Sequence, residues 1–78
     1  MLDRSDFRNN VITAIKNVTN KSEVTIGDDE TFEDYGIDSL DRMNILLELE
    51  KILGKELGDI DLDSVNTINL LFEEIEKK

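Results

Sequence analysis

Apolar residues recur at helical spacing in the first segment of the chain, from about Asp3 to Val18. One stripe results, made of Phe7, Val11, Ala14, Ile15 and Val18, because residues three, four and seven apart share a helix face. Asp3 suits the N-cap position, where its carboxylate can accept a hydrogen bond from a first-turn N–H. The pattern predicts an amphipathic helix.

The periodicity disappears between Thr19 and Gly36. Turn- and cap-forming residues dominate this stretch, and four apolar residues are scattered among them: Val24, Ile26, Phe32 and Tyr35. A connection of this length in a small domain is usually functional or packed by its own side chains. We expect a long ordered loop between the first and second helices, anchored by these four residues.

A second helix is predicted to begin after Asp38, with Asp38 as N-cap and Asp41 at the third helical position. It runs through Leu53 and ends at Gly54. Apolar residues cover most of its circumference, and the polar strip is narrow: Asp41, Asn44, Glu48 and Lys51. A helix of this kind is expected to be central, with several neighbours around it and the polar strip outward.

Beyond Gly54 we expect a loop with one short helical turn near residues 61–65, since the alternation at Ile60 and Leu62 has no partner strand. Thr67 then caps a last helix from Ile68 to Lys77. Its buried face comprises Ile68, Leu71, Phe72 and Ile75. The predicted fold is all-α, a small four-helix bundle with three main helices and one short one, in a single domain over residues 1–78.

The net charge of the chain limits the classes of partner that it is expected to bind. The 78 residues carry a formal net charge of −10, which repels nucleic acids and anionic lipid surfaces and favours basic patches on other proteins. Neither a membrane-spanning apolar run nor a signal peptide is recognised. We expect a cytoplasmic monomer that does not insert into membranes.

Composition also limits the chemistry. The chain has no His and no Cys, which excludes imidazole bases, thiol nucleophiles, thiolate zinc sites and disulfides. The acidic residues Asp59, Asp61 and Asp63 have calcium-loop spacing, but Ser64 and Leu70 stand where that loop needs Gly and Glu. A solvated acidic loop is the better interpretation, and neither a metal site nor intrinsic catalysis is expected.

Ser39 lies in the first turn of the second helix, where free N–H groups and the helix dipole favour a phosphate. Taken alone, the tripeptide Asp38-Ser39-Leu40 is better interpreted as a simple helix cap. The surrounding segment, residues 32–41 (FEDYGIDSLD), resembles the signature of acyl carrier proteins and peptidyl carrier domains. The resemblance continues through the apolar positions of the second helix, Gly54, the acidic loop, Val65 and the Thr67-capped last helix.

The resemblance implies a carrier bundle with no activity of its own. A separate phosphopantetheinyl transferase would attach 4′-phosphopantetheine from coenzyme A to Ser39 through a phosphodiester, and the arm would carry acyl groups as thioesters. The absence of Cys agrees with this role, because the thiol of the arm is then the only one. An unmodified carrier-like interaction module is the alternative.

By the same resemblance, partner enzymes with basic docking patches would contact the second helix. The implied docking residues are Asp38, Leu40, Asp41, Met43, Asn44 and Glu50, with core packing as an equal alternative for Leu40 and Met43. Carriers of primary fatty acid synthesis usually have acidic residues at the positions of Asn44 and Lys51. These departures, with the added charge of Arg42, favour a specialised fatty acid, polyketide or related pathway.

The acyl cargo is not specified by the sequence. Apolar volume between the second and last helices would be lined by Leu46, Leu71, Phe72 and Ile75. The same four residues would be core in any bundle, and core packing is the preferred interpretation.

The acidic composition predicts stability that depends on salt. Like charges repel one another in the folded state, and a core of this size supplies only about 3–5 kcal/mol. We expect added salt or divalent cations to raise the melting temperature, measured by circular dichroism. An identical melting temperature at low and moderate salt would contradict this.

Overall fold

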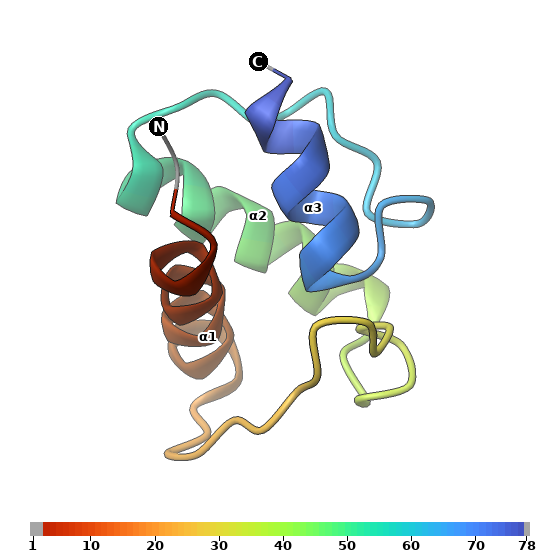
Figure 1. Ribbon diagram of the computed structural model, residues 1–78. Helices are drawn as coiled ribbons and strands as arrows, with labels where there is room; N and C mark the ends of the chain where they lie inside the picture. The colour runs from red at the N-terminus through yellow and green to blue at the C-terminus, as the bar shows by residue number, and fades with distance from the viewer. Residues whose placement is uncertain (1–2, 78) are drawn as a thin grey trace.

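The computed structural model describes residues 3–77 and is all-helical, with no strand within this range (Figure 1). The helices are α1 (Arg4–Thr19), α2 (Ser39–Leu53) and α3 (Ile68–Glu76). Residues 20–38 connect α1 to α2, and residues 54–67 connect α2 to α3. Within residues 3–77, none of the helices has the length and apolar character needed to cross a membrane.

Side-chain caps fix the helix starts where the sequence predicts them. The N-cap residues are Asp3, Asp38 and Thr67, and each side chain accepts a hydrogen bond from the backbone N–H three residues later. α1 and α2 both end in a left-handed residue, Asn20 at φ 59° and Gly54 at φ 67°. Both have N–H groups that donate to the preceding turn, which satisfies carbonyls that the helix leaves free.

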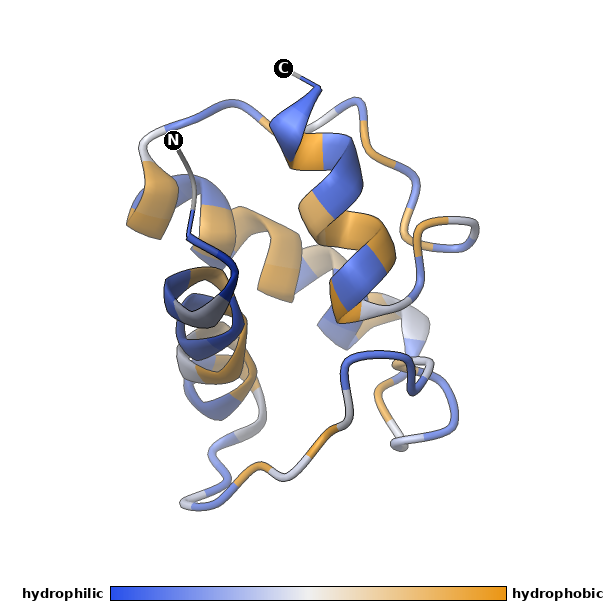
Figure 2. Cartoon of the chain, viewed as in Figure 1, coloured by the Kyte–Doolittle hydropathy of each residue, from blue (hydrophilic) through white to orange (hydrophobic). Residues whose placement is uncertain are grey.

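α1, rather than α2, is the helix that packs against both others. The Cα atoms of α2 and α3 nowhere approach within 8 Å of each other. The prediction of a central α2 is therefore wrong. Figure 2 shows hydrophobic residues along much of α2, but one side of this helix has no neighbour within the described chain.

The exposed side of α2 is apolar. Leu40 is 64% exposed, Met43 60% and Leu47 50%. Their spacing of three and four residues places them in one row along the helix, here called the α2 stripe. Ile45, Leu46 and Leu49 face the core instead. Helical periodicity cannot separate these two apolar faces, because both consist of the same residue types.

Side chains from the two connections belong to the same hydrophobic core as those of the helices. Seven apolar side chains of the connections are buried: Val24, Ile26, Phe32, Ile37, Leu57, Ile60 and Leu62. Tyr35 packs at the edge of this core, and its hydroxyl accepts a hydrogen bond from the Thr25 N–H at 3.0 Å. The connections are therefore part of the hydrophobic core rather than a covering over it.

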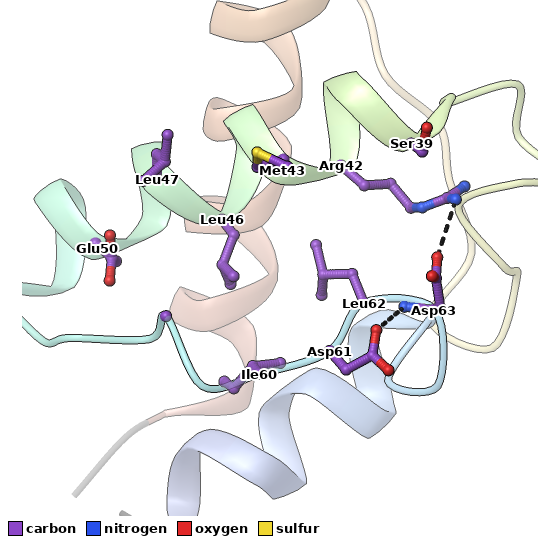
Figure 3. Close-up of a pocket in the computed structure, with 11 residues that line it drawn as sticks. Ser39, Arg42, Met43, Leu46, Leu47, Glu50, Ile60, Asp61, Leu62 and Asp63 are labelled. Atoms are coloured by element: carbon purple, nitrogen blue, oxygen red, sulfur yellow. Dashed lines mark hydrogen bonds and ion pairs between the residues drawn. The ribbon is translucent and has the colours of Figure 1, made fainter.

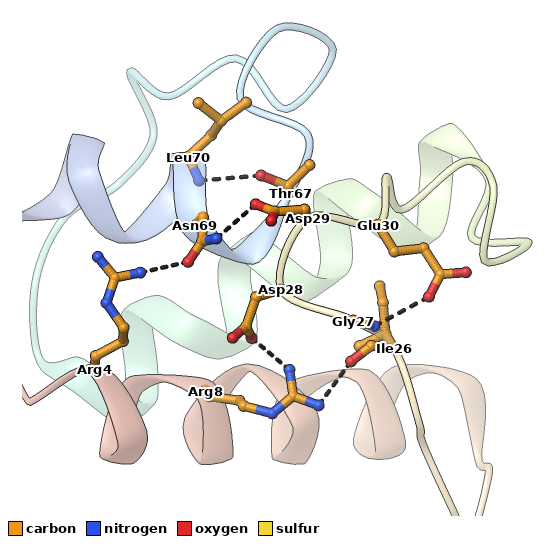
Figure 4. A network of polar contacts seen from close by, with 10 residues as sticks. All are labelled: Arg4, Arg8, Ile26, Gly27, Asp28, Asp29, Glu30, Thr67, Asn69 and Leu70. Atoms are coloured by element: carbon orange, nitrogen blue, oxygen red, sulfur yellow. Dashed lines mark hydrogen bonds and ion pairs between the residues drawn. The ribbon is translucent and has the colours of Figure 1, made fainter.

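A polar network fixes residues 26–30 against α1 and α3 (Figure 4). Arg8 of α1 donates to the Asp28 carboxylate at 2.6 Å and to the Ile26 carbonyl at 2.7 Å. Asn69 of α3 donates through its side chain to Asp29 at 2.6 Å and through its backbone to the Asp28 carbonyl at 3.1 Å. These bonds hold the first connection against both α1 and α3.

The predicted short fourth helix is not formed, and the described chain has three helices. Residues 61–65 make a single turn, in which the Val65 N–H donates to the Asp61 carbonyl at 2.9 Å. The Asp61 carboxylate accepts from the Asp63 N–H at 3.0 Å and from the Ser64 hydroxyl at 3.1 Å. These side-chain bonds compete with helical ones, which is why Asp favours turns over helix interiors.

Candidate functional site

Ser39 is the first residue of α2 and is exposed. The residue before it, Asp38, accepts from the Asp41 N–H at 2.8 Å through its carboxylate and from the Arg42 N–H at 2.9 Å through its carbonyl. Ile37 is buried, and its N–H donates to the Phe32 carbonyl at 2.9 Å. A core anchor and a helix cap therefore position the Ser39 hydroxyl at the surface.

The approach to α2 needs a tight turn. Gly36 has φ 95°, a conformation that side-chain-bearing residues rarely adopt, and its N–H donates to the Glu33 carbonyl at 3.0 Å. The Phe32 N–H donates to the carbonyl of Asn66 at 3.0 Å. The segment before Ser39 is thus tied to the segment before α3.

A groove of about 420 Å³ runs from Ser39 along α2 and is closed on its other side by residues 58–63 (Figure 3). Apolar side chains from both sides line it, among them Leu46, Ile60 and Leu62. Polar side chains at the Ser39 end are those of Arg42, Asp61 and Asp63. The groove therefore offers an apolar surface that begins beside an exposed hydroxyl.

Arg42 bridges the two sides of this groove. Its guanidinium donates to the Ile37 carbonyl at 3.0 Å and to the Asp63 carboxylate at 3.2 Å, and its side chain is only 14% exposed. The charge that the sequence places near the docking residues is thus paired with a carboxylate. Asp63 was missed as a neighbour of this site because its partner lies 21 residues away, and no local pattern signals the pair.

The implied docking residues divide into two groups. Leu40 and Met43 belong to the exposed α2 stripe, so core packing is wrong for both. Asp38 and Asn44 are exposed, and Asp41 is half-buried. All three are close in sequence to the residues of the α2 stripe. Glu50 differs, because its carboxylate accepts from the Leu57 N–H at 2.7 Å and holds the second connection.

All four residues considered for an acyl-chain site belong to the hydrophobic core. Leu71 and Ile75 are fully buried, and Phe72 packs edge-on against Phe7 with ring centroids 5.5 Å apart. Leu46 is the one of the four that also lines the groove. The interpretation of these α3 residues as core is therefore confirmed.

The acidic segment around Asp61 serves the turn itself. The Asp61 carboxylate bonds within the turn and Asp63 pairs with Arg42. Within residues 3–77 no group of three or more acidic side chains is arranged to hold a metal ion.

The site thus combines an exposed serine at a helix start, an approach anchored by hydrogen bonds and an apolar groove beside it. Residues 9–75 match the family described as the phosphopantetheine attachment site. The chain belongs to the acyl carrier protein family. This match covers most of the chain, and the identification made from residues 32–41 is confirmed.

Three curated acyl carrier proteins illustrate the relationship. Acyl carrier protein 2, mitochondrial, of Arabidopsis thaliana is 30% identical over 70 residues, covering 88% of this chain and 56% of the relative. The protein of Phytoplasma australiense is 40% identical over 45 residues, 58% of this chain and 59% of the relative. The protein of Buchnera aphidicola subsp. Acyrthosiphon pisum (strain Tuc7) is 31% identical over 58 residues, which cover 74% of this chain and 72% of the relative.

The chain thus spans less than two thirds of the length of the first two relatives. No solved structure matches the chain. The family match indicates a covalently attached 4′-phosphopantetheine. Acyl carrier proteins are non-catalytic carriers.

The surroundings of Ser39 fit such a group. The hydroxyl is exposed, it lies at a helix N-terminus that stabilises negative charge, and a groove begins beside it. The thiol supplied by the arm is the group that binds acyl chains, and the residues around Ser39 determine where that arm would leave the surface.

Asp38 tests whether the helix start depends on a cap or on charge. Asp38→Ala removes the acceptor for the Asp41 N–H and is expected to lower the free energy of unfolding by about 0.5–2 kcal/mol. Asp38→Asn keeps an acceptor and is expected to stay within a few tenths of a kcal/mol of the native chain. Urea denaturation measures both, and equal losses in the two variants would show that the charge matters more than the cap.

Proposed function

We propose that this chain is a single-domain acyl carrier protein whose 4′-phosphopantetheine is attached to Ser39. The observation that carries the proposal is the exposure of Ser39 as the first residue of α2, within the region that matches the family. The carrier would present acyl groups, held as thioesters, to partner enzymes in a specialised fatty acid, polyketide or related pathway.

In the attachment step, the Ser39 Oγ forms a bond to the phosphorus that bears the pantetheine group of coenzyme A. The pyrophosphate bond breaks, the nucleotide portion leaves, and the hydroxyl proton passes to a base. The nearest carboxylate in sequence, that of Asp38, already accepts a hydrogen bond from the Asp41 N–H. With no His in the chain, we assign the base to a separate phosphopantetheinyl transferase.

The docking surface consists of the α2 stripe, Leu40, Met43 and Leu47, with Asp38, Asp41 and Asn44 beside it. Exposed apolar side chains next to carboxylates suit a partner with a basic patch around an apolar contact. We assign Glu50 a structural role in addition, since the Leu57 N–H occupies its carboxylate.

The charges along α2 support our proposal of a specialised pathway. Asn44 is neutral, and Lys51 pairs with Glu48 at 3.6 Å, so the far half of the helix carries less negative charge than a uniformly acidic docking helix would. Charge complementarity mainly determines association rate and partner choice. A cytoplasmic monomer stays our prediction, although one relative is named as mitochondrial.

Attachment at Ser39 is tested by intact-protein mass after incubation with coenzyme A, magnesium and a promiscuous phosphopantetheinyl transferase. The native chain is expected to gain one phosphopantetheine and Ser39→Ala none. Ser39→Ala is expected to fold like the native chain, because the exposed hydroxyl has no part in the core. Circular dichroism checks this. No gain in the folded native chain with several transferases would overturn the proposed site.

An unmodified interaction module is the second candidate, favoured by the same exposed stripe. The two candidate functions predict different effects of substitutions on the function of the protein in the cell that produces it. Loss of function in Ser39→Ala with an intact fold supports the carrier. Retained function in Ser39→Ala, with loss on changing the charges of Asp41 and Glu50, supports the interaction module. Because the Glu50 carboxylate holds the Leu57 N–H, its variant counts only where circular dichroism shows an intact fold.

The docking surface is tested by Met43→Gln. Because Met43 is exposed, the free energy of unfolding is expected to change by no more than about 0.5 kcal/mol. The KM of the transferase for the carrier is expected to rise, since an apolar contact is lost. Leu70→Gln, at a 42% exposed position on α3, is the matched control and leaves KM unchanged. Equal KM values for all three chains would contradict docking through the stripe.

A further inference from the structure

Arg42 is the only basic residue between residues 22 and 50. It follows Ser39 by three residues on α2, so the two side chains lie on the same side of the helix. Both line the groove described above, and both line a second hollow formed with Glu33, Gly36 and Ile37. Figure 3 shows the Arg42 side chain extending from α2 toward the Ser39 end of the groove.

The link from Arg42 to Asp63 is weak. It joins one nitrogen to one carboxylate oxygen at 3.2 Å, whereas strong guanidinium–carboxylate pairs are bidentate and shorter. The Asp63 side chain is 78% exposed, so water can solvate its carboxylate if Arg42 moves away. Because one partner is exposed to this extent, the pair is expected to contribute little to stability. The hydrogen bond to the Ile37 carbonyl is separate and uses the other terminal nitrogen of the guanidinium.

A phosphodiester on Ser39 would bring a new negative charge to this end of α2. The carboxylates of Asp38 and Asp41 are close in sequence and would repel it. The planar guanidinium matches the geometry of phosphate oxygens and binds them through two parallel hydrogen bonds. Arg42 is therefore the side chain positioned to compensate the added charge.

From these contacts, and resting on attachment at Ser39, we infer that Arg42 leaves Asp63 for the phosphodiester when Ser39 is modified, which releases the turn at residues 61–65 from α2. Asp61, Leu62 and Asp63 of this turn form one side of the groove. The modified protein then has a more mobile groove wall than the unmodified one. Partner enzymes can distinguish the two forms by this wall as well as by the arm itself.

Amide hydrogen exchange, read by nuclear magnetic resonance, tests the release. The Ser64 and Val65 N–H groups both donate to the Asp61 carbonyl and report on the turn. Their exchange is expected to become about twofold to fivefold faster on modification, the range that corresponds to losing one exposed ion pair. The Gly54 N–H, which donates to Glu50 at the far end of α2, is the internal control and keeps its rate.

Three variants identify Arg42 as the cause. Asp63→Asn and Arg42→Gln both remove the pair, so the unmodified chains are expected to exchange at the faster rate already, with no further change on modification. Lys51→Gln removes a different cation of α2, paired with Glu48, and is expected to behave as the native chain.

The intact mass, measured on every sample, separates the two hypotheses. A native chain that gains the arm without faster exchange at Ser64 and Val65 overturns the role of Arg42 and leaves the carrier function standing. The same is true if modification accelerates exchange equally in Arg42→Gln. A folded native chain that gains no arm overturns attachment at Ser39 and this inference together.

Discussion

The hydrogen bond from the Asp41 N–H to the Asp38 carboxylate, 2.8 Å long, determines where α2 begins. One residue earlier, Ile37 is buried in the core, and one residue later, Ser39 is exposed. The backbone passes from core to surface within three residues, and the cap fixes the direction in which it leaves. The hydroxyl is therefore presented at a defined place without any side chain devoted to holding it.

The same constraint explains the architecture around α2. A helix that starts at the surface and presents an apolar stripe outward can be covered on one side only. α1 supplies that cover together with the two connections, while α2 and α3 stay apart. Apolar area on the stripe is withheld from the core, which lowers the stability available to so small a domain. A surface of this kind is maintained where binding requires it.

Local features of the fold could be predicted because their causes lie within a few residues. The caps are Asp3, Asp38 and Thr67, and the side chain of each accepts a hydrogen bond from the N–H three residues later. Ser39 can be identified from the residues directly next to it in the sequence. The partners of Arg42 and Glu50 could not be predicted, since each bond joins α2 to the second connection. The position of α2 could not be predicted either, because buried and exposed apolar faces have the same periodicity. A turn is found at Asp61 where a short helix is predicted, because the Asp61 side chain bonds within the turn and an apolar pattern does not reveal such bonds.

The burial of Ile26, Phe32, Leu57 and Leu62 has a consequence for how the length of this chain can vary. Loops ordinarily absorb insertions and deletions because they lie outside the core. Here an added residue between positions 24 and 37 would shift core side chains out of register and move the start of α2. Residues 21–23 and 55–56 are exposed, and we expect them to accept an inserted label or affinity peptide without disturbing Ser39.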